Sequence, residues 1–194
     1  NFLILKRSSD VVIIWQDTRF VNDGYRIFFQ FLNPDGTVDL EPNGRPVTES
    51  VAGHQLTPNA VVTPDDQIAI TWEDARGNDP NVYAQLISAD GQRLWGDLGI
   101  KLTNSVPIRQ KDPFVSYYNG SLYFGWSNSQ QLGTNFYYYI YGQRIYNNQK
   151  MWGPDGVLIS VLPQGNLNNE CTLYSLEDNY YVWERINPNV DSRT

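Results

Sequence analysis

The sequence predicts an all-β protein built from repeats of one four-stranded unit, and three observations carry this prediction. Short apolar runs alternate along their length instead of recurring every three or four residues, which is typical of strands and not of helices. Turn-forming Gly, Pro, Asn and Asp residues separate these runs. The third observation is the spacing of four tryptophans that each close an apolar run, at 57, 54 and 57 residues: Trp15, Trp72, Trp126 and Trp183. Such a fixed period indicates repeated supersecondary units.

Other positions keep the same register. A glutamine recurs in the strand that follows each of the first three tryptophans, as Gln30, Gln85 and Gln143. A glycine comes further on, with a hydroxyl side chain four residues after it: Gly44 and Thr48, Gly99 and Thr103, Gly156 and Ser160. The register therefore extends over the whole repeat.

The first repeat covers residues 1–51, with strands expected at 2–5, 11–15, 25–32 and, weakly, 44–48. Pro46 marks the fourth strand as an edge or irregular strand, because proline has no N–H to donate to a neighbouring strand. The second repeat, residues 52–106, has the same elements and shows alternation of Ile68, Ile70 and Trp72 on one strand face.

The third repeat covers residues 107–165, with strands expected at 122–126 and 136–146, and the fourth covers residues 166–194. Only two strands, at 171–174 and 180–183, are expected in the fourth repeat. The chain therefore offers about three and a half repeats.

Four strands per repeat with one or two aromatic residues each are typical of a β-propeller blade. A single four-stranded sheet cannot bury its faces alone, so neighbouring blades must share a core. Since a closed ring needs about 4–8 blades, we expect residues 1–194 to form part of one propeller domain. Its partners would be the remaining blades, from a longer chain or from a partner protein.

Composition excludes several classes of function. The formal charge is −7, and the 14 lysines and arginines are scattered singly, which argues against nucleic-acid binding. No apolar run approaches the ~18 residues of a membrane span. The absence of an initiator Met and of a signal sequence leads us to expect either a removed leader or an internal piece of a longer protein.

The second repeat carries a motif that resembles a known family. Its elements are Trp72, Asp74 and Arg76, then Val82-Tyr-Ala-Gln85, Asp90-Gly91, Leu94-Trp95 and Gly99. The chain resembles the bacterial exported β-propeller repeat family. That family implies a large secreted or cell-surface protein, often in bacteria that use type IX secretion, and hence an extracellular or cell-surface location.

Two acid–base pairs follow the tryptophan strands, Asp17 with Arg19 and Asp74 with Arg76. They could bind a ligand at equivalent positions around the rim of the propeller, or they could fix the loop that follows the strand. Because structural devices recur with a repeated fold whereas an active site occurs once, the structural role is favoured. We therefore assign these four residues, with the four tryptophans and three glutamines, as structural repeat positions.

The sequence offers two further kinds of possible site, one for calcium and one for a sugar. The Asn/Asp/Gly loops after the tryptophan strands could offer oxygen ligands to calcium, but these residues are also ordinary turn formers, so we expect no cofactor and assign no metal ligand. Phe136 and Tyr137 open a tyrosine-rich strand and are candidates for stacking on a sugar. His54 is the single histidine, so histidine-based catalytic triads have little support.

The sequence thus favours a non-enzymatic extracellular or cell-surface module for protein or carbohydrate interaction, with no catalytic residue assigned. The alternatives are part of a carbohydrate-active propeller enzyme, glycosidase- or sialidase-like, and a structural spacer in a large surface protein. Paired carboxylates could support glycoside cleavage, but residues 33–37 lack the Asp-box pattern of sialidases. The ligand and the total number of blades are not fixed by the sequence.

Overall fold

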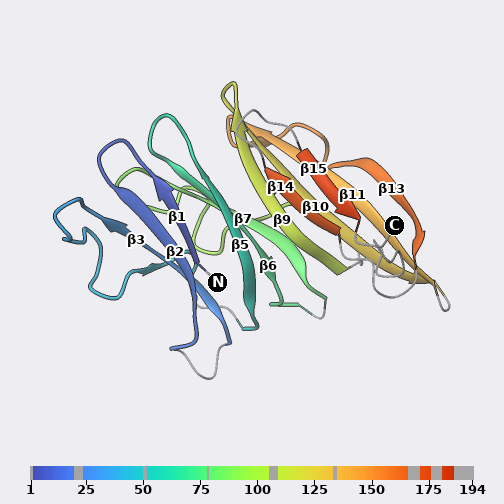
Figure 1. Ribbon diagram of the computed structural model, residues 1–194, viewed down its shortest axis with the longest axis horizontal. Coiled ribbons are helices and arrows are strands. Elements are labelled where there is room, and N and C mark those ends of the chain that lie inside the picture. The colour runs from blue at the N-terminus through green and yellow to red at the C-terminus, as the bar shows by residue number, and fades with distance from the viewer. Residues whose placement is uncertain are drawn as a thin grey trace, which may run out of the picture.

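The computed structural model describes residues 2–19, 24–49, 52–77, 79–104, 109–132, 135–165, 171–175 and 181–185. These residues form strands and turns and contain no helix (Figure 1). Among them there is therefore no helix that could span a membrane. The strands assemble into successive antiparallel sheets that lie side by side along the long axis of the molecule. The expected all-β class is confirmed.

The first two sheets each have four strands in sequential order. The first contains β1 (Phe2–Lys6), β2 (Val11–Asp17), β3 (Arg26–Leu32) and β4 (Arg45–Pro46). The second contains β5 (Gln55–Val62), β6 (Ile68–Asp74), β7 (Asn81–Ile87) and β8 (Ile100–Lys101). Pro46 lies on the edge strand β4, where its missing N–H is tolerated.

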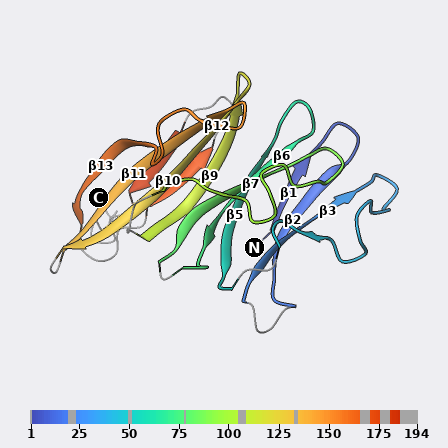
Figure 2. The same ribbon diagram turned by 180° about the vertical axis from the view of Figure 1, so that it is seen from behind.

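The third sheet has a longer second strand than the sequence suggested. It comprises β9 (Arg109–Tyr118), β10 (Ser121–Leu132), β11 (Asn135–Tyr146), β12 (Gln149–Lys150) and β13 (Val157–Gly165), the last two both pairing with β11 (Figure 2). The strand expected to end at Trp126 continues to Leu132, because polar residues pair across a long hairpin with β11. A two-stranded sheet, β14 (Cys171–Ser175) with β15 (Tyr181–Arg185), follows.

The first three tryptophans occupy equivalent places in their sheets. Trp15, Trp72 and Trp126 each pair across to an aromatic residue on the third strand and stack on it, with ring centroids 6.0–6.3 Å apart: Phe28, Tyr83 and Tyr141. Trp183 pairs with Leu173 in the backbone register, and its side chain lies outside the described residues.

The repeated glycine is explained by the tryptophan ring of its own sheet. A Cβ atom added at Gly99 would lie 2.9 Å from the Trp72 ring and 2.6 Å from the carbonyl oxygen of Ala84. Its φ of +69° is also a conformation that glycine adopts without steric cost. The tryptophan ring thus lies flat against the fourth strand only because that position has no side chain.

We call the sheet face that carries the tryptophan the tryptophan face. The tryptophan face of the second sheet, with Trp72 fully buried, packs on the opposite face of the first sheet in one core cluster. The tryptophan face of the third sheet, with Trp126 fully buried, packs in the same way on the second sheet. Neighbouring repeats therefore sandwich a common core, as expected of propeller blades.

A polar contact accompanies each of these two cores. The Gln55 side chain accepts a hydrogen bond from the Ile27 N–H (3.2 Å) and donates one to the Thr48 hydroxyl (2.8 Å). Gln110 repeats both contacts one blade later, with Val82 and Thr103 as partners. These glutamines begin the first strands of their sheets and satisfy buried groups of the preceding sheet.

The repeated glutamine of the third strand acts within its own sheet. Gln85 donates from its amide to the Gly96 carbonyl (2.7 Å) and accepts from the Trp95 N–H (2.9 Å). Gln30 and Gln143 make the corresponding pair of bonds. Each glutamine thereby closes the connection between the third and fourth strands.

Candidate functional site

Asp74 and Arg76 form a bidentate pair at the end of β6. Asp74 is 1% exposed, and its carboxylate accepts hydrogen bonds from the Arg76 guanidinium at 2.7 and 2.6 Å and from the Trp72 indole N–H at 2.7 Å. The guanidinium also lies 4.0 Å from the Tyr83 ring centroid. Every one of these contacts lies within the same sheet and its loop, so the pair fixes the loop that follows the strand. We call such an Asp–Arg pair a staple.

Asp17 and Arg19 repeat the arrangement at the end of β2. The Asp17 carboxylate accepts from the Trp15 indole (3.0 Å) and from Arg19, whose guanidinium covers the Phe28 ring. Hydrogen bonds from the Arg19 side chain lower the pKa of Asp17 to about 2. Charge-assisted hydrogen bonds favour the ionised carboxylate, which is the physical cause of this shift.

The third repeat has Asn128 in place of the aspartate. Within the described part of the chain, neither amide atom of this fully buried side chain has a hydrogen-bond partner, nor does the Trp126 indole N–H. Buried polar groups without partners cost about 1–3 kcal/mol each. The third repeat therefore lacks the staple of the first two.

Glu73 of the second sheet and Asp112 of the third approach each other where β6 lies against β9, the first strand of its sheet. The Glu73 carboxylate, at the end of β6, accepts hydrogen bonds from the Thr57 hydroxyl (2.8 Å) and from the Asp112 backbone N–H (3.1 Å). The Asp112 carboxylate accepts a hydrogen bond from the Ser127 hydroxyl at 3.1 Å. Glu73 is 8% exposed whereas Asp112 is exposed to solvent.

The backbone at this cluster is strained. Thr57 and Asp112 have φ values of +48° and +52°, and both lie where the first strand shifts its register against the second. A positive φ is uncommon for a non-glycine residue and is an outlier for β-branched threonine. Such strain tends to concentrate at functional sites. We call Glu73 and Asp112, with Thr57 and Ser127, the inner carboxylate cluster.

This cluster was not predicted from the sequence, although the repeat register contains a signal for it. Thr57 and Asp112 each follow an equivalent glutamine, Gln55 or Gln110, by two residues. The carboxylate and the hydroxyl exchange places between the two blades: Thr57 faces Glu73, and Asp112 faces Ser127. The one-residue bulge and the inter-blade contact are tertiary features that the repeat alone does not disclose.

The predicted sugar-stacking residues lie on a different strand. Tyr137 is half-buried on β11, which β10 separates from the inner strand β9, and the Phe136 side chain lies outside the described residues. The structure thus does not bring Tyr137 to β9, which carries Asp112. Among the described residues, no group of three or more His, Cys, Asp and Glu side chains could hold a metal ion; several of the loops considered for calcium lie outside them.

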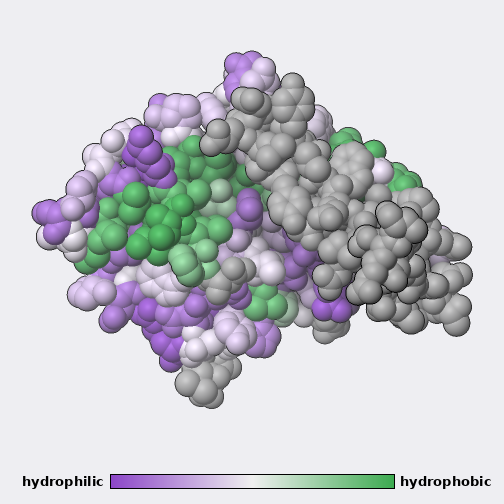
Figure 3. All heavy atoms as spheres, viewed as in Figure 1, coloured by the Kyte–Doolittle hydropathy of each residue, from purple (hydrophilic) through white to green (hydrophobic). Residues whose placement is uncertain are grey.

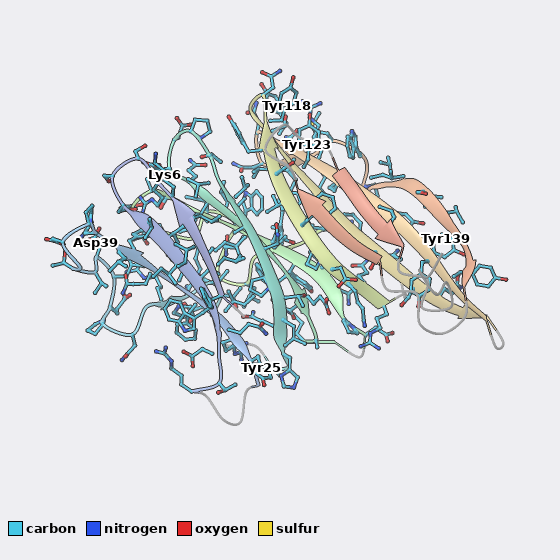
Figure 4. The ribbon with its side chains drawn as sticks, viewed as in Figure 1. Lys6, Tyr25, Asp39, Tyr118, Tyr123 and Tyr139 are labelled. Carbon is cyan, nitrogen blue, oxygen red and sulfur yellow. The ribbon has the colours of Figure 1, made fainter. Side chains whose placement is uncertain are left out.

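Two hollows open at one end of the sheets, and Thr63 and Tyr117 line both of them. One, of about 560 Å³, is open and lies along the first strands near Lys6 and Val61. The other, of about 360 Å³, lies between the second and third sheets beside Trp95 and Tyr117. Figure 4 places Lys6 and Tyr118 at this end of the sheets and Tyr25 at the other.

The chain resembles solved structures in fold. The endo-arabinase of Bacteroides thetaiotaomicron VPI-5482 matches 97% of this chain, which covers 70% of that protein, with a TM-score of 0.55 and 13% sequence identity. An exo-1,5-α-L-arabinanase from a bovine ruminal metagenomic library matches 95% of this chain, which covers 72% of it, with a TM-score of 0.50 and 13% identity. No protein-family model and no curated protein sequence matches the chain.

These likenesses show the fold, a partial β-propeller, as the repeat predicted. They contradict the expectation of a non-enzymatic module: the two propellers that match nearly the whole chain are glycan-cleaving enzymes, so the alternative of a carbohydrate-active propeller is the better supported. The expectation was wrong because it rested on a repeat motif that carries the fold, and a fold motif does not indicate the function.

Proposed function

We propose that the chain forms part of a carbohydrate-active β-propeller enzyme that cleaves glycosidic bonds, with Glu73 and Asp112 as its carboxylate pair. The observation that carries the proposal is the approach of Glu73 to Asp112 across two adjacent blades, where the backbones of Thr57 and Asp112 are strained. The folds of the two arabinanases support the same class of reaction.

Glycosidases commonly use two carboxyl groups, one as the acid that protonates the leaving oxygen and one as the base or nucleophile. The exposed Asp112 is the member that reaches a sugar, and the Ser127 hydroxyl orients its carboxylate. The more buried Glu73 holds the Asp112 backbone through its N–H and supplies the second carboxylate. The pair belongs to two blades, so its geometry depends on their packing.

The substrate class that we propose is an α-L-arabinan, by analogy with the enzymes of similar fold. We further propose that the protein acts outside the cell, because its repeats resemble those of exported propellers. The remaining blades would come from a longer chain, in keeping with the 70% coverage of the endo-arabinase.

Hydrolysis and binding assays on the purified chain within its complete propeller test the proposal. We expect release of reducing sugar from arabinan, binding of arabinohexaose by calorimetry, and a loss of turnover of about 100-fold or more in D112N and in E73Q, the range for removing a general acid or base. The matched control is D90N, which alters an exposed carboxylate of the turn between β7 and β8.

The outcomes separate the possibilities. If the chain neither binds nor cleaves arabinan or other plant glycans, the proposed function is wrong. If D112N and E73Q keep full turnover, the activity resides elsewhere and the inner carboxylate cluster serves only to join the blades.

A further inference from the structure

The 360 Å³ hollow between the second and third sheets, which we call the interblade cavity, has a filled counterpart one blade earlier. Its lining includes Thr63, Leu86 and Trp95 of the second repeat and Tyr117, Tyr146 and Asn148 of the third. A volume of this size lies in the range of small-molecule sites.

The strand register identifies the equivalent residues between the first and second sheets. Thr63 follows Val62, which pairs with Ile68, just as Arg7 follows Lys6, which pairs with Val11. Each residue donates its backbone N–H to close the turn that follows, Arg7 to Asp10 and Thr63 to Gln67. Thr63 is therefore the counterpart of Arg7.

The side chain of Arg7 fills the earlier interface. Its guanidinium carbon lies 3.8 Å from the Phe31 ring centroid, and it donates a hydrogen bond to the carbonyl oxygen of Ala89 in the next blade. Asp10 lies 3.4 Å from the guanidinium as its counter-ion. The counterparts of Phe31 and Ala89 one blade later, by the register of Gln30, Gln85 and Gln143, are Leu86 and Asn147, and both line the interblade cavity.

Threonine is shorter than arginine by several atoms, so the substitution vacates the space that a guanidinium occupies one blade earlier. The residues around this space can attract a cation. Trp95, Tyr117 and Tyr146 supply aromatic rings, which attract cations through their faces. Asp65 is the one charged side chain among the described residues that line the cavity.

Two of the rings are held in place by contacts with polar side chains. The Trp95 indole N–H donates to the Asn148 side chain across the two sheets (2.9 Å). The Arg144 guanidinium lies 5.6 Å from the Tyr146 ring centroid and donates to Ser121. Arg144 is not among the residues that line the cavity.

We propose that the interblade cavity binds a small organic cation that carries a guanidinium group. The guanidinium lies where that of Arg7 lies in the preceding interface, against the aromatic wall, with the Asn147 carbonyl oxygen as acceptor and Asp65 as counter-charge. This site is separate from the inner carboxylate cluster and is independent of the proposed glycosidase activity.

Titration calorimetry with n-butylguanidinium, against its neutral isostere n-butylurea, tests the proposal on the whole chain. We expect saturable binding of the guanidinium compound and at least tenfold weaker binding of the urea. D65N should weaken binding about fivefold without unfolding the chain, because Asp65 is an exposed turn residue. T63R should abolish binding, because its own side chain fills the cavity as Arg7 does.

R7T is the matched reverse variant and should create a second site between the first and second sheets. A folded R7T chain that gains no second site would remove the equivalence on which the proposal rests. Equal binding of n-butylurea, unchanged binding by both T63R and D65N, or no binding at all would overturn the proposal and leave a cavity that holds water only.

Discussion

The first and second sheets carry the same tryptophan face in two different environments. On the second sheet this face is covered by the first sheet, and Trp72, Ile68 and Ile70 are fully buried. On the first sheet the same face has no described residues over it, so Phe2 and Ile4 remain 67% and 57% exposed. Figure 3 shows apolar residues gathered over the first sheet.

The same strand pattern therefore gives a buried face where a neighbouring sheet covers it and an exposed face where no described residue covers it. Trp15 keeps its stack on Phe28 and its indole bond to Asp17, yet it is only half-buried. The local geometry of the repeat is therefore built within each sheet, whereas the burial of the tryptophan is supplied by the neighbour. A face of this kind is suited to receive another blade.

The largest expected difference lies between the tryptophans themselves. Trp72→Ala should lower the free energy of unfolding by about 3–5 kcal/mol, the range for a large aromatic residue in a core. Trp15→Ala should cost about 1–2 kcal/mol, because much of that ring still touches water. Urea unfolding curves of the two variants give both values, and equal losses would show that the first sheet is covered as well.

A smaller difference is expected between the two staples. Asp74→Asn should cost about 1–3 kcal/mol, since a buried charge-assisted network loses its acceptor charge. Asp17→Asn should cost about 1 kcal/mol or less, since Arg19 is the more exposed arginine, 33% against 18% for Arg76. Thermal melts of the two variants compare the costs.

Glycan binding distinguishes the two roles considered for these pairs. We expect both variants to bind arabinohexaose as the unmodified chain does. An Asp74→Asn chain that keeps its melting temperature but loses binding would instead make the pair part of a ligand site.

The smallest expected effect is the acid dependence of the Asp17 staple. Its folded pKa of about 2 lies below the ordinary value of 3.8, so the group stabilises the fold at pH values above about 4. That contribution is lost as the pH falls from about 4 to about 2, because the unfolded chain takes up the proton first. The stability gap between the chain and D17N should therefore narrow over this window. A gap that stays constant down to pH 2 would contradict the assigned cause.

Much of the fold could be predicted because its signals are local. The alternation on β6, the edge proline on β4 and the recurrence of the glycine all follow from one repeat unit. The length of β10 could not be predicted, because it depends on pairing between polar residues that carry no strand signal of their own.

The sequence by itself determined the repeat, the four-stranded units and the staple residues, since each depends on contacts within some fifty residues of chain. The tertiary structure was needed to show which acidic residues of different blades lie close together and where a cavity lies between the blades. Glu73 and Asp112 are 39 residues apart and meet because two blades pack. The interblade cavity lies where a threonine stands at the position that carries an arginine in the preceding interface, and the strand pairing within each sheet shows that the two positions are equivalent.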